Sequence, residues 1–205
     1  MKTVTTSLLT ICGLEELDHH SKRGVTHVLS ILDPDWPDPQ AFAQYDLHHR
    51  TILKFHDVIE PGPGLILPQV QHVEDILEFG NSIGTDSAPR LDPHLLVHCH
   101  MGVSRSTAAM AILMAQANSS QNDEAIFTRL LELRPQAWPN SRMIEFADEL
   151  LGRGGGFLHA LGALYATQLS ARPDLADFMR THGRVRELEL AARERQPLIT
   201  RDETA

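Results

Sequence analysis

Ten residues, 97–106, with the sequence V-H-C-H-M-G-V-S-R-S, constrain the fold of this chain more than any other segment. The apolar run 94–98 follows Pro93 and predicts a buried strand, and the helix-forming run 106–117 predicts a helix. The chain must then turn tightly between them. In such a turn the backbone N–H groups point inward, and the helix N-terminus adds partial positive charge. The segment therefore predicts an anion-binding loop that needs no metal.

The side chains of this loop suit nucleophilic chemistry on a phosphoryl group. The field that would bind an anion also favours the thiolate form of Cys99, which makes it a nucleophile. Arg105 offers a planar charged fork for two phosphoryl oxygens. Gly102, in mid-loop, can take the positive φ that lets the backbone curl. We expect Ser106 to offer its hydroxyl to the departing sulfur, and His98 to support the loop through its ring.

The pattern H-C-x-x-G-x-x-R-S resembles the signature of the cysteine-dependent protein tyrosine phosphatases, and its G-x-S-R-S form is most similar to the dual-specificity-like branch of bacterial type. The resemblance implies an α/β fold with a mostly parallel central sheet flanked by helices. It also implies hydrolysis through a phosphocysteine, with no cofactor. The alternative is a buried structural cysteine followed by a chance arginine, and the flanking residues disfavour it. The resemblance assigns phosphoryl binding to the loop residues His100, Met101, Gly102, Val103, Ser104 and Arg105.

The resemblance further implies an aspartate, on a loop upstream of the cysteine, that protonates the leaving oxygen. Asp57 fits best, because it follows the apolar run 51–55 and precedes V-I-E-P-G-P-G, a predicted surface loop. A turn or cap role for Asp57 is the alternative, and Glu60 is the nearest substitute as acid. Three earlier aspartates are interpreted as solvated acidic surface: Asp33, Asp35 and Asp38. Candidates for the pocket walls are Trp36, Arg50 and His56.

Charge and composition exclude several function classes. The chain has 205 residues and a formal net charge of −9, with ten Lys and Arg against twenty Asp and Glu before residue 153. This acidic body argues against nucleic acid and anionic membranes as partners, and the lack of lysine in the loop argues against phosphoinositides. No apolar run approaches the ~20 residues of a membrane span. The twelve histidines show no metal-ligand spacing, so we expect no metal.

The two cysteines do not form a disulfide framework, and a reducing compartment suits a catalytic thiolate. Cys12 is interpreted as a packing residue, with oxidation to a pair with Cys99 as the alternative. The N-terminal run 4–12 is interpreted as the first strand and not as a signal peptide. We therefore expect a cytoplasmic protein.

The periodicity along the chain predicts strands alternating with helices, which favours a parallel sheet with the site at the carboxyl end of a strand. Asn140 is interpreted as a helix N-cap. The alternative is that it belongs to a segment similar to the family's element after the loop helix. The predicted strands are 4–12, 25–32, 51–55 and 94–98. The predicted helices are 14–21, 68–83, 106–117, 123–133 and 141–151, with a proline-rich loop through Pro39.

The chain changes character at G-R-G-G-G, residues 152–156, which predicts a flexible hinge. We therefore divide it into a catalytic domain, 1–152, and a helical extension, 153–205. Apolar residues between 157 and 169 lie on one helical face, and a second helical stretch is predicted at about 184–195. The extension is expected to pack on its own domain. A homodimer through these helices, or a partner helix, is the alternative.

The sequence thus predicts a phosphomonoester hydrolase, a protein tyrosine or dual-specificity phosphatase, acting on a phosphorylated protein or a small phosphomonoester. Two alternatives of different class stay open. One is a phosphate-dependent binding module that keeps the loop. The other is a different enzyme on the same loop, either an arsenate reductase or a small-molecule or lipid phosphatase.

Overall fold

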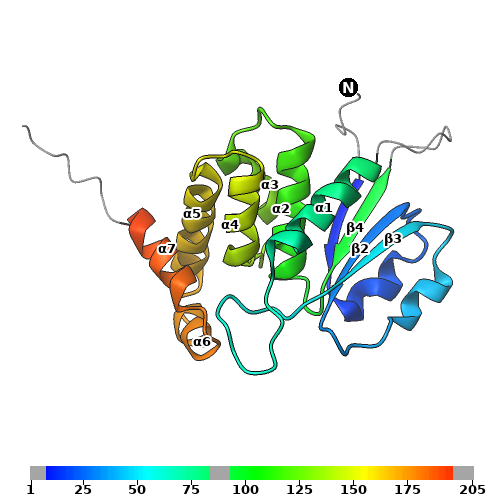
Figure 1. Cartoon of the computed structure of the whole chain (residues 1–205), viewed down its shortest axis with the longest axis horizontal. Coiled ribbons are helices and arrows are strands. Elements are labelled where there is room, and N and C mark those ends of the chain that lie inside the picture. Colours follow the sequence, from blue (N-terminus) through cyan, green and yellow to red (C-terminus); the bar gives the residue numbers. More distant parts are fainter. Residues whose placement is uncertain (1–7, 84–92, 196–205) are drawn as a thin grey trace, which may run out of the picture.

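The computed structural model describes residues 8–83 and 93–195. Its centre is a parallel sheet in the order β1-β4-β2-β3 (Figure 1). The strands are β1 (Leu8–Cys12), β2 (His27–Leu32), β3 (His49–Lys54) and β4 (His94–His98). The expected parallel sheet flanked by helices is confirmed. Of the first predicted strand, residues 4–7 lie outside the described residues.

The two faces of the sheet bury alternate residues of the same strands, as the period of two along a strand requires. Leu29 and Val97 face the large core under the α-helices. Val28, Leu96 and Cys12 face a smaller core on the other side. Both central strands, β2 and β4, are buried along their whole length. A strand covered on both faces reads as a continuous apolar run, and this is the pattern at 94–98.

The helical layer holds α1 (Val70–Ser82), α2 (Arg105–Ala117), α3 (Asp123–Leu133) and α4 (Ser141–Leu150), close to the predicted bounds. The opposite layer is made of two 3-10 helices, η1 (Leu14–His20) and η2 (Gln40–Gln44). The helix expected at 14–21 thus forms as a 3-10 helix. The second, η2, falls where only a loop was expected, because five residues of 3-10 helix leave no periodic pattern.

Three further helices extend the helical side away from the sheet: α5 (Gly156–Ala171), α6 (Leu175–Thr181) and α7 (Val185–Arg195) (Figure 1). Helix α5 packs against α3 and α4 on one side and against α7 on the other. Its apolar residues Phe157, Leu161 and Tyr165 are fully buried within the same chain. This confirms the packing expected for the extension. The short helix α6 was not predicted.

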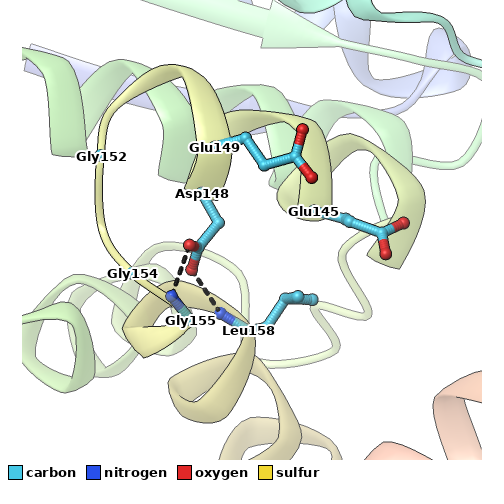
Figure 2. A pocket seen from close by; sticks show the side chains of 7 residues that line it. All are labelled: Glu145, Asp148, Glu149, Gly152, Gly154, Gly155 and Leu158. Carbon is cyan, nitrogen blue, oxygen red and sulfur yellow. Dashed lines mark hydrogen bonds between the residues drawn. The ribbon is translucent and has the colours of Figure 1, made fainter.

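The glycine-rich segment 152–156, predicted from the sequence to be a flexible hinge, forms a turn that is hydrogen-bonded to α4. The carboxylate of Asp148 accepts hydrogen bonds from the backbone N–H groups of Gly155, Phe157 and Leu158, at 2.6, 2.8 and 3.2 Å. Figure 2 shows the bonds to Gly155 and Leu158. An anion at the first N–H groups of a helix stabilises it. The turn therefore anchors the start of α5 to the end of α4.

No helix within residues 8–83 and 93–195 is long and apolar enough to cross a membrane.

Candidate active site

The loop 99–104 joins β4 to α2 and turns its backbone carbonyls outward. The carbonyls of His100, Met101, Gly102, Val103 and Ser104 all accept hydrogen bonds from groups outside the loop. The donors are Leu14, Arg134, Trp138, Asn140 and the following helical turn. A peptide unit whose C=O points out has its N–H on the opposite side. The outward carbonyls therefore leave the loop N–H groups on the inner side, the side on which an anion is predicted to bind.

Gly102 is required by this geometry. Its φ is +68°, in the left-handed region. A Cβ there would lie 2.5 Å from the backbone carbon of Cys12 and 2.6 Å from the backbone N of Gly13. The backbone of β1 thus passes directly against the loop, and both the conformation and the close approach exclude a side chain.

Arg134 braces the loop from outside, a role that the sequence did not reveal. Its guanidinium donates to the carbonyls of Gly102 and Met101, at 2.9 and 3.1 Å. It also forms a bidentate ion pair with Glu16, at 2.8 and 2.7 Å. Glu16 in turn accepts from the backbone N–H of Gly13, at 2.6 Å. An arginine next to a proline gives no sequence signal for such a contact 118 residues away.

Cys99 lies at the end of β4 with 1% of its surface exposed. Its Sγ is 3.2 Å from the hydroxyl oxygen of Ser106, so the pair expected from the sequence is brought together. Cys12 is also free and fully buried. Burial, aided by the negative charge of Glu16, raises the pKa of Cys12 to about 12. Cys12 thus remains a neutral thiol that fills the core, which agrees with the packing role predicted for it.

The ring of His98 is held against strand β2, and its support of the loop stays a prediction. Its Nε2 lies 2.7 Å from the hydroxyl of Ser30, which also accepts a hydrogen bond from Arg50 at 2.8 Å. Burial and the nearby Arg50 charge lower the pKa of His98 to about 3, so its ring is neutral. Arg50 also stacks on the Phe42 ring and pairs with Asp38. These contacts tie Arg50 to β2, to Asp38 and to η2, and its predicted place in the pocket wall stays a prediction.

Arg105 is oriented by two acceptors. Its Nη1 donates to the carbonyl of Phe55 at 2.6 Å and to Asp33 at 2.7 Å. The side chain is 3% exposed, and its Nε has no hydrogen-bond partner among the described residues. A buried guanidinium N–H without an acceptor is costly. The remaining donor therefore fits an oxygen of a bound oxyanion.

Asp33 corrects one sequence interpretation. It was assigned to solvated acidic surface, but its carboxylate pairs with Arg105 and its backbone N–H bonds the ring of His100 at 3.2 Å. It follows β2 directly, and the carboxyl ends of parallel strands meet at one edge of a sheet. That position was the signal that could have identified it. Asp35 and Asp38 are exposed, as expected.

Asp57 follows β3 and reaches the loop. Its carboxylate accepts from Ser104 at 2.7 Å and from Asn140 at 3.0 Å, and lies 4.0 Å from Arg105 Nε. Burial alone would raise the pKa of Asp57. The charges of Arg184 and Arg105, with the two hydrogen bonds, outweigh burial and lower the pKa below its usual value. Glu60 is exposed, and no hydrogen bond joins it to the loop in the described structure.

Arg184, from the turn before α7, is an unexpected member of the site. Its Nη2 lies 2.5 Å from the Asp57 carboxylate and 2.9 Å from the Asp57 carbonyl oxygen, both of which accept from it. Its Nη1 pairs with Glu187 at 3.0 Å. Glu187 is fully buried and accepts from the indole N–H of Trp138 and the backbone N–H of Ser141. The extension thus contributes a buried cation to the catalytic body.

Asn140 caps α4, as predicted, because its side-chain oxygen accepts from the Met143 N–H at 3.3 Å. Its amide nitrogen also donates to Asp57, so the cap contacts the site as well. Trp36 and His100 have ring centroids 4.5 Å apart, with Trp36 half exposed at the mouth of the loop. His56 bonds the backbone of Ile66 and shapes the loop after Asp57. In the described chain no cluster of His, Cys, Asp or Glu is arranged to hold a metal.

The fold places the chain among known structures, although no protein-family model and no curated protein matches its sequence. Human DUSP28 is 17% identical, with a TM-score of 0.53, over 75% of this chain and 99% of that one. A mouse putative dual specificity phosphatase complexed with zinc tungstate is 17% identical, with a TM-score of 0.51, over 71% and 86%. DUSP15 is 18% identical, with a TM-score of 0.50, over 84% and 95%. The chain therefore has the fold of the dual-specificity phosphatases, as its loop signature implied.

Proposed function

We propose that this protein is a metal-free phosphomonoesterase that acts through a phosphocysteine. The observation that carries the proposal is the loop itself: outward carbonyls, a buried cysteine beside Ser106, and an Arg105 fixed by two acceptors with a donor left over. Such a nest binds a tetrahedral oxyanion next to the sulfur of Cys99. The fold shared with dual-specificity phosphatases supports the same chemistry.

In the first step Cys99 Sγ attacks phosphorus while the loop N–H groups and Arg105 hold the equatorial oxygens. The P–O bond to the leaving group breaks, and Asp57 gives its proton to that oxygen. In the second step water attacks the phosphocysteine and gives a proton back to Asp57. The S–P bond breaks, phosphate leaves, and the Ser106 hydroxyl, 3.2 Å away, stabilises the sulfur as a thiolate.

Asp57 must be protonated to act as the acid, although its pKa is lowered in the free enzyme. A bound phosphoryl dianion opposes the influence of Arg105, because its negative charge lies against the same guanidinium. Arg184 is then a positioning residue that holds Asp57 through its backbone carbonyl and its carboxylate. The acid is thus fixed at the loop, and substrate charge favours its protonation.

We further propose a protein tyrosine or dual-specificity phosphatase with a phosphorylated protein as substrate, in the cytoplasm. The dual-specificity phosphatases of similar fold support this assignment over a small phosphomonoester. An arsenate reductase is disfavoured, because the second cysteine is fully buried and its raised pKa keeps it a thiol. A binding module without turnover is disfavoured because Cys99, Arg105 and Asp57 are assembled as a working set.

The test of the nucleophile is Cys99→Ser, assayed on phenyl phosphate. We expect hydrolysis to fall by at least about a thousandfold, because removal of a nucleophile leaves only loop binding. Cys12→Ala is the matched control, since the side chain of this second buried cysteine packs in the smaller core on the other side of the sheet, and it should retain hydrolysis. Unchanged hydrolysis in Cys99→Ser would rule out the proposal.

The test of the acid compares Asp57→Asn with Glu60→Gln. Asp57→Asn should lower kcat by roughly a hundredfold and remove the fall in rate above the optimal pH, as expected for loss of a general acid. Glu60→Gln should keep both the rate and the profile. The reverse result would move the acid to Glu60.

A further inference from the structure

A cavity of about 790 Å³ lies between the phosphate loop and the C-terminal extension. Asp57, Met101 and Val103 line it on the catalytic side, and Leu175 and Phe178 of α6 line it on the other. Figure 1 shows α6 at the same end of the molecule as the loop that follows β3. The cavity is therefore formed jointly by the catalytic body and the extension.

Buried ionic contacts fix the wall contributed by the extension. Arg184 follows α6 and also lines the cavity, and it is tied to Asp57 and to Glu187. Glu187 holds the indole of Trp138, which forms part of the floor. The distance between α6 and the loop is thus set by charged groups with little exposure, at 9% for Arg184 and 0% for Glu187.

Most of the surface offered to a ligand is apolar. Its larger side chains are Met101, Trp138, Leu175, Phe178 and Met179. The polar side chains nearby have partners within the protein: Gln168 donates to the carbonyls of Pro135 and Ala137, Arg172 pairs with Asp174, and His182 bonds the Phe178 carbonyl. Methionines adapt to apolar groups of different shape. A pocket of this size and lining fits an apolar group and imposes few polar demands.

The cavity lies beside the reacting centre. Asp57 and Ser104 line it, while Cys99 and Arg105 do not. Its occupant is therefore a group held next to the phosphorylated residue. In an extended peptide, neighbouring residues are about 3.3 Å apart along the chain. A side chain one to three positions from the phosphorylated residue can therefore reach a cavity beside the reacting centre.

We propose that this cavity is a specificity subsite for a large apolar side chain that lies one to three positions from the phosphorylated residue of a peptide substrate. The proposal rests on the phosphatase function proposed above and adds a sequence preference to it. Phe178, half exposed at 53%, is the side chain of α6 best placed to contact such a residue.

The test compares phosphotyrosine peptides that differ only by Ala or Leu or Phe at each of the three positions on either side. We expect kcat/KM of the native protein to rise by about tenfold at one of these positions when Ala becomes Leu or Phe, as burial of a large apolar side chain predicts. Phe178→Ala should reduce this ratio to about threefold or less, because part of the wall is lost.

Two further variants make the test selective. Leu175→Trp fills the cavity and should also abolish the preference. Ile52→Ala is the matched control, because Ile52 is an exposed apolar residue on β3 (43%) outside the cavity, and it should keep the full ratio.

The outcomes separate the two proposals. If the native protein fails to hydrolyse phenyl phosphate, the phosphatase function itself is wrong. If it hydrolyses phenyl phosphate but all peptides react equally, or if the preference survives both cavity variants, the subsite is wrong. If apolar aryl phosphates show the preference and peptides do not, the occupant is a small-molecule leaving group, and the peptide subsite is wrong.

Discussion

Replacement of Arg184 by methionine tests whether the extension is tied to the catalytic body through a buried cation. Methionine is similar to arginine in length, but it cannot donate hydrogen bonds to the carboxylate and carbonyl oxygens of Asp57 or to the carboxylate of Glu187. We expect the variant to fold, because α5 and its apolar contacts are unchanged. We expect it to be clearly less stable.

The magnitude follows from the exposure of the two carboxylates. Removing one partner of a buried ion pair costs about 3–5 kcal/mol, whereas an exposed pair is worth about 0–1 kcal/mol. Asp57 is 29% exposed and keeps its hydrogen bonds from Ser104 and Asn140, so the loss of its ion pair with Arg184 contributes little to the loss of stability. Glu187 is fully buried and keeps only neutral donors in place of its cation. We expect a loss of about 3 kcal/mol at pH 7.5, or a fall in Tm of about 6–12 °C.

The loss should depend on pH with a definite sign. Burial raises the pKa of Glu187 in the folded protein, and Arg184 opposes that shift, so Arg184→Met raises the pKa further. A carboxyl with a raised folded pKa contributes stability at pH values below its unfolded pKa and loses it as the pH rises through the folded pKa. The variant should therefore lose less stability at pH 5 than at pH 7.5.

Denaturant unfolding at both pH values measures these quantities. Arg184→Met with Glu187→Gln should recover about 1–2 kcal/mol relative to Arg184→Met alone, because the buried charge is gone. The matched control is Arg186→Met, which breaks an ion pair with Glu145 in which both side chains are 33% exposed, and should cost less than about 1 kcal/mol. A loss below 1 kcal/mol for Arg184→Met, or a loss that is the same at both pH values, would refute this reasoning.

Three other predictions concern the loop. Gly102→Ala should abolish hydrolysis and lower stability by roughly 2–4 kcal/mol in denaturant unfolding, because it combines a φ of +68° with a 2.5 Å approach to the β1 backbone. Arg134→Met should lower kcat/KM on phenyl phosphate by about tenfold or more, because two loop carbonyls lose their donor; an unchanged value would contradict the bracing role. Ser104→Ala removes a hydrogen bond that lowers the pKa of Asp57, so the fall in kcat at high pH should move to higher pH; a move to lower pH would be inconsistent with Asp57 as the acid.

The sequence predicts those parts of the site that are contiguous along the chain. Residues 98–106 lie on one strand, one turn and one helix, so local geometry and residue type place Cys99, Gly102 and Ser106 correctly. The predicted bounds of the longer helices and strands are also close to the observed ones, because their apolar residues recur with the period of a helix or a strand. The 3-10 helix η2 is too short to leave a repeating pattern and was not predicted, and α6 was not predicted either.

The contacts that the sequence could not predict join residues far apart in the chain. Arg134 meets Glu16 across 118 residues, and Arg184 meets Asp57 across 127. Each is a lone charged residue whose surroundings resemble ordinary surface. Asp33 could have been found, because topology brings the carboxyl ends of β2 and β4 to the same edge. Ionic contacts within the site therefore need the three-dimensional fold, whereas the nucleophile does not.

The buried pair of Arg184 and Glu187 indicates what helices α5 to α7 contribute to the site. If α5 to α7 served only to cover apolar surface, a pair of well-packed hydrophobic residues would stabilise this junction at least as well as two buried charges. Arg184 instead also donates to the carboxylate of Asp57 and lowers its pKa. A purely apolar junction would leave Asp57 without that contact. The arrangement is thus better explained by the placement of Asp57, the proposed acid, than by the stability of the extension.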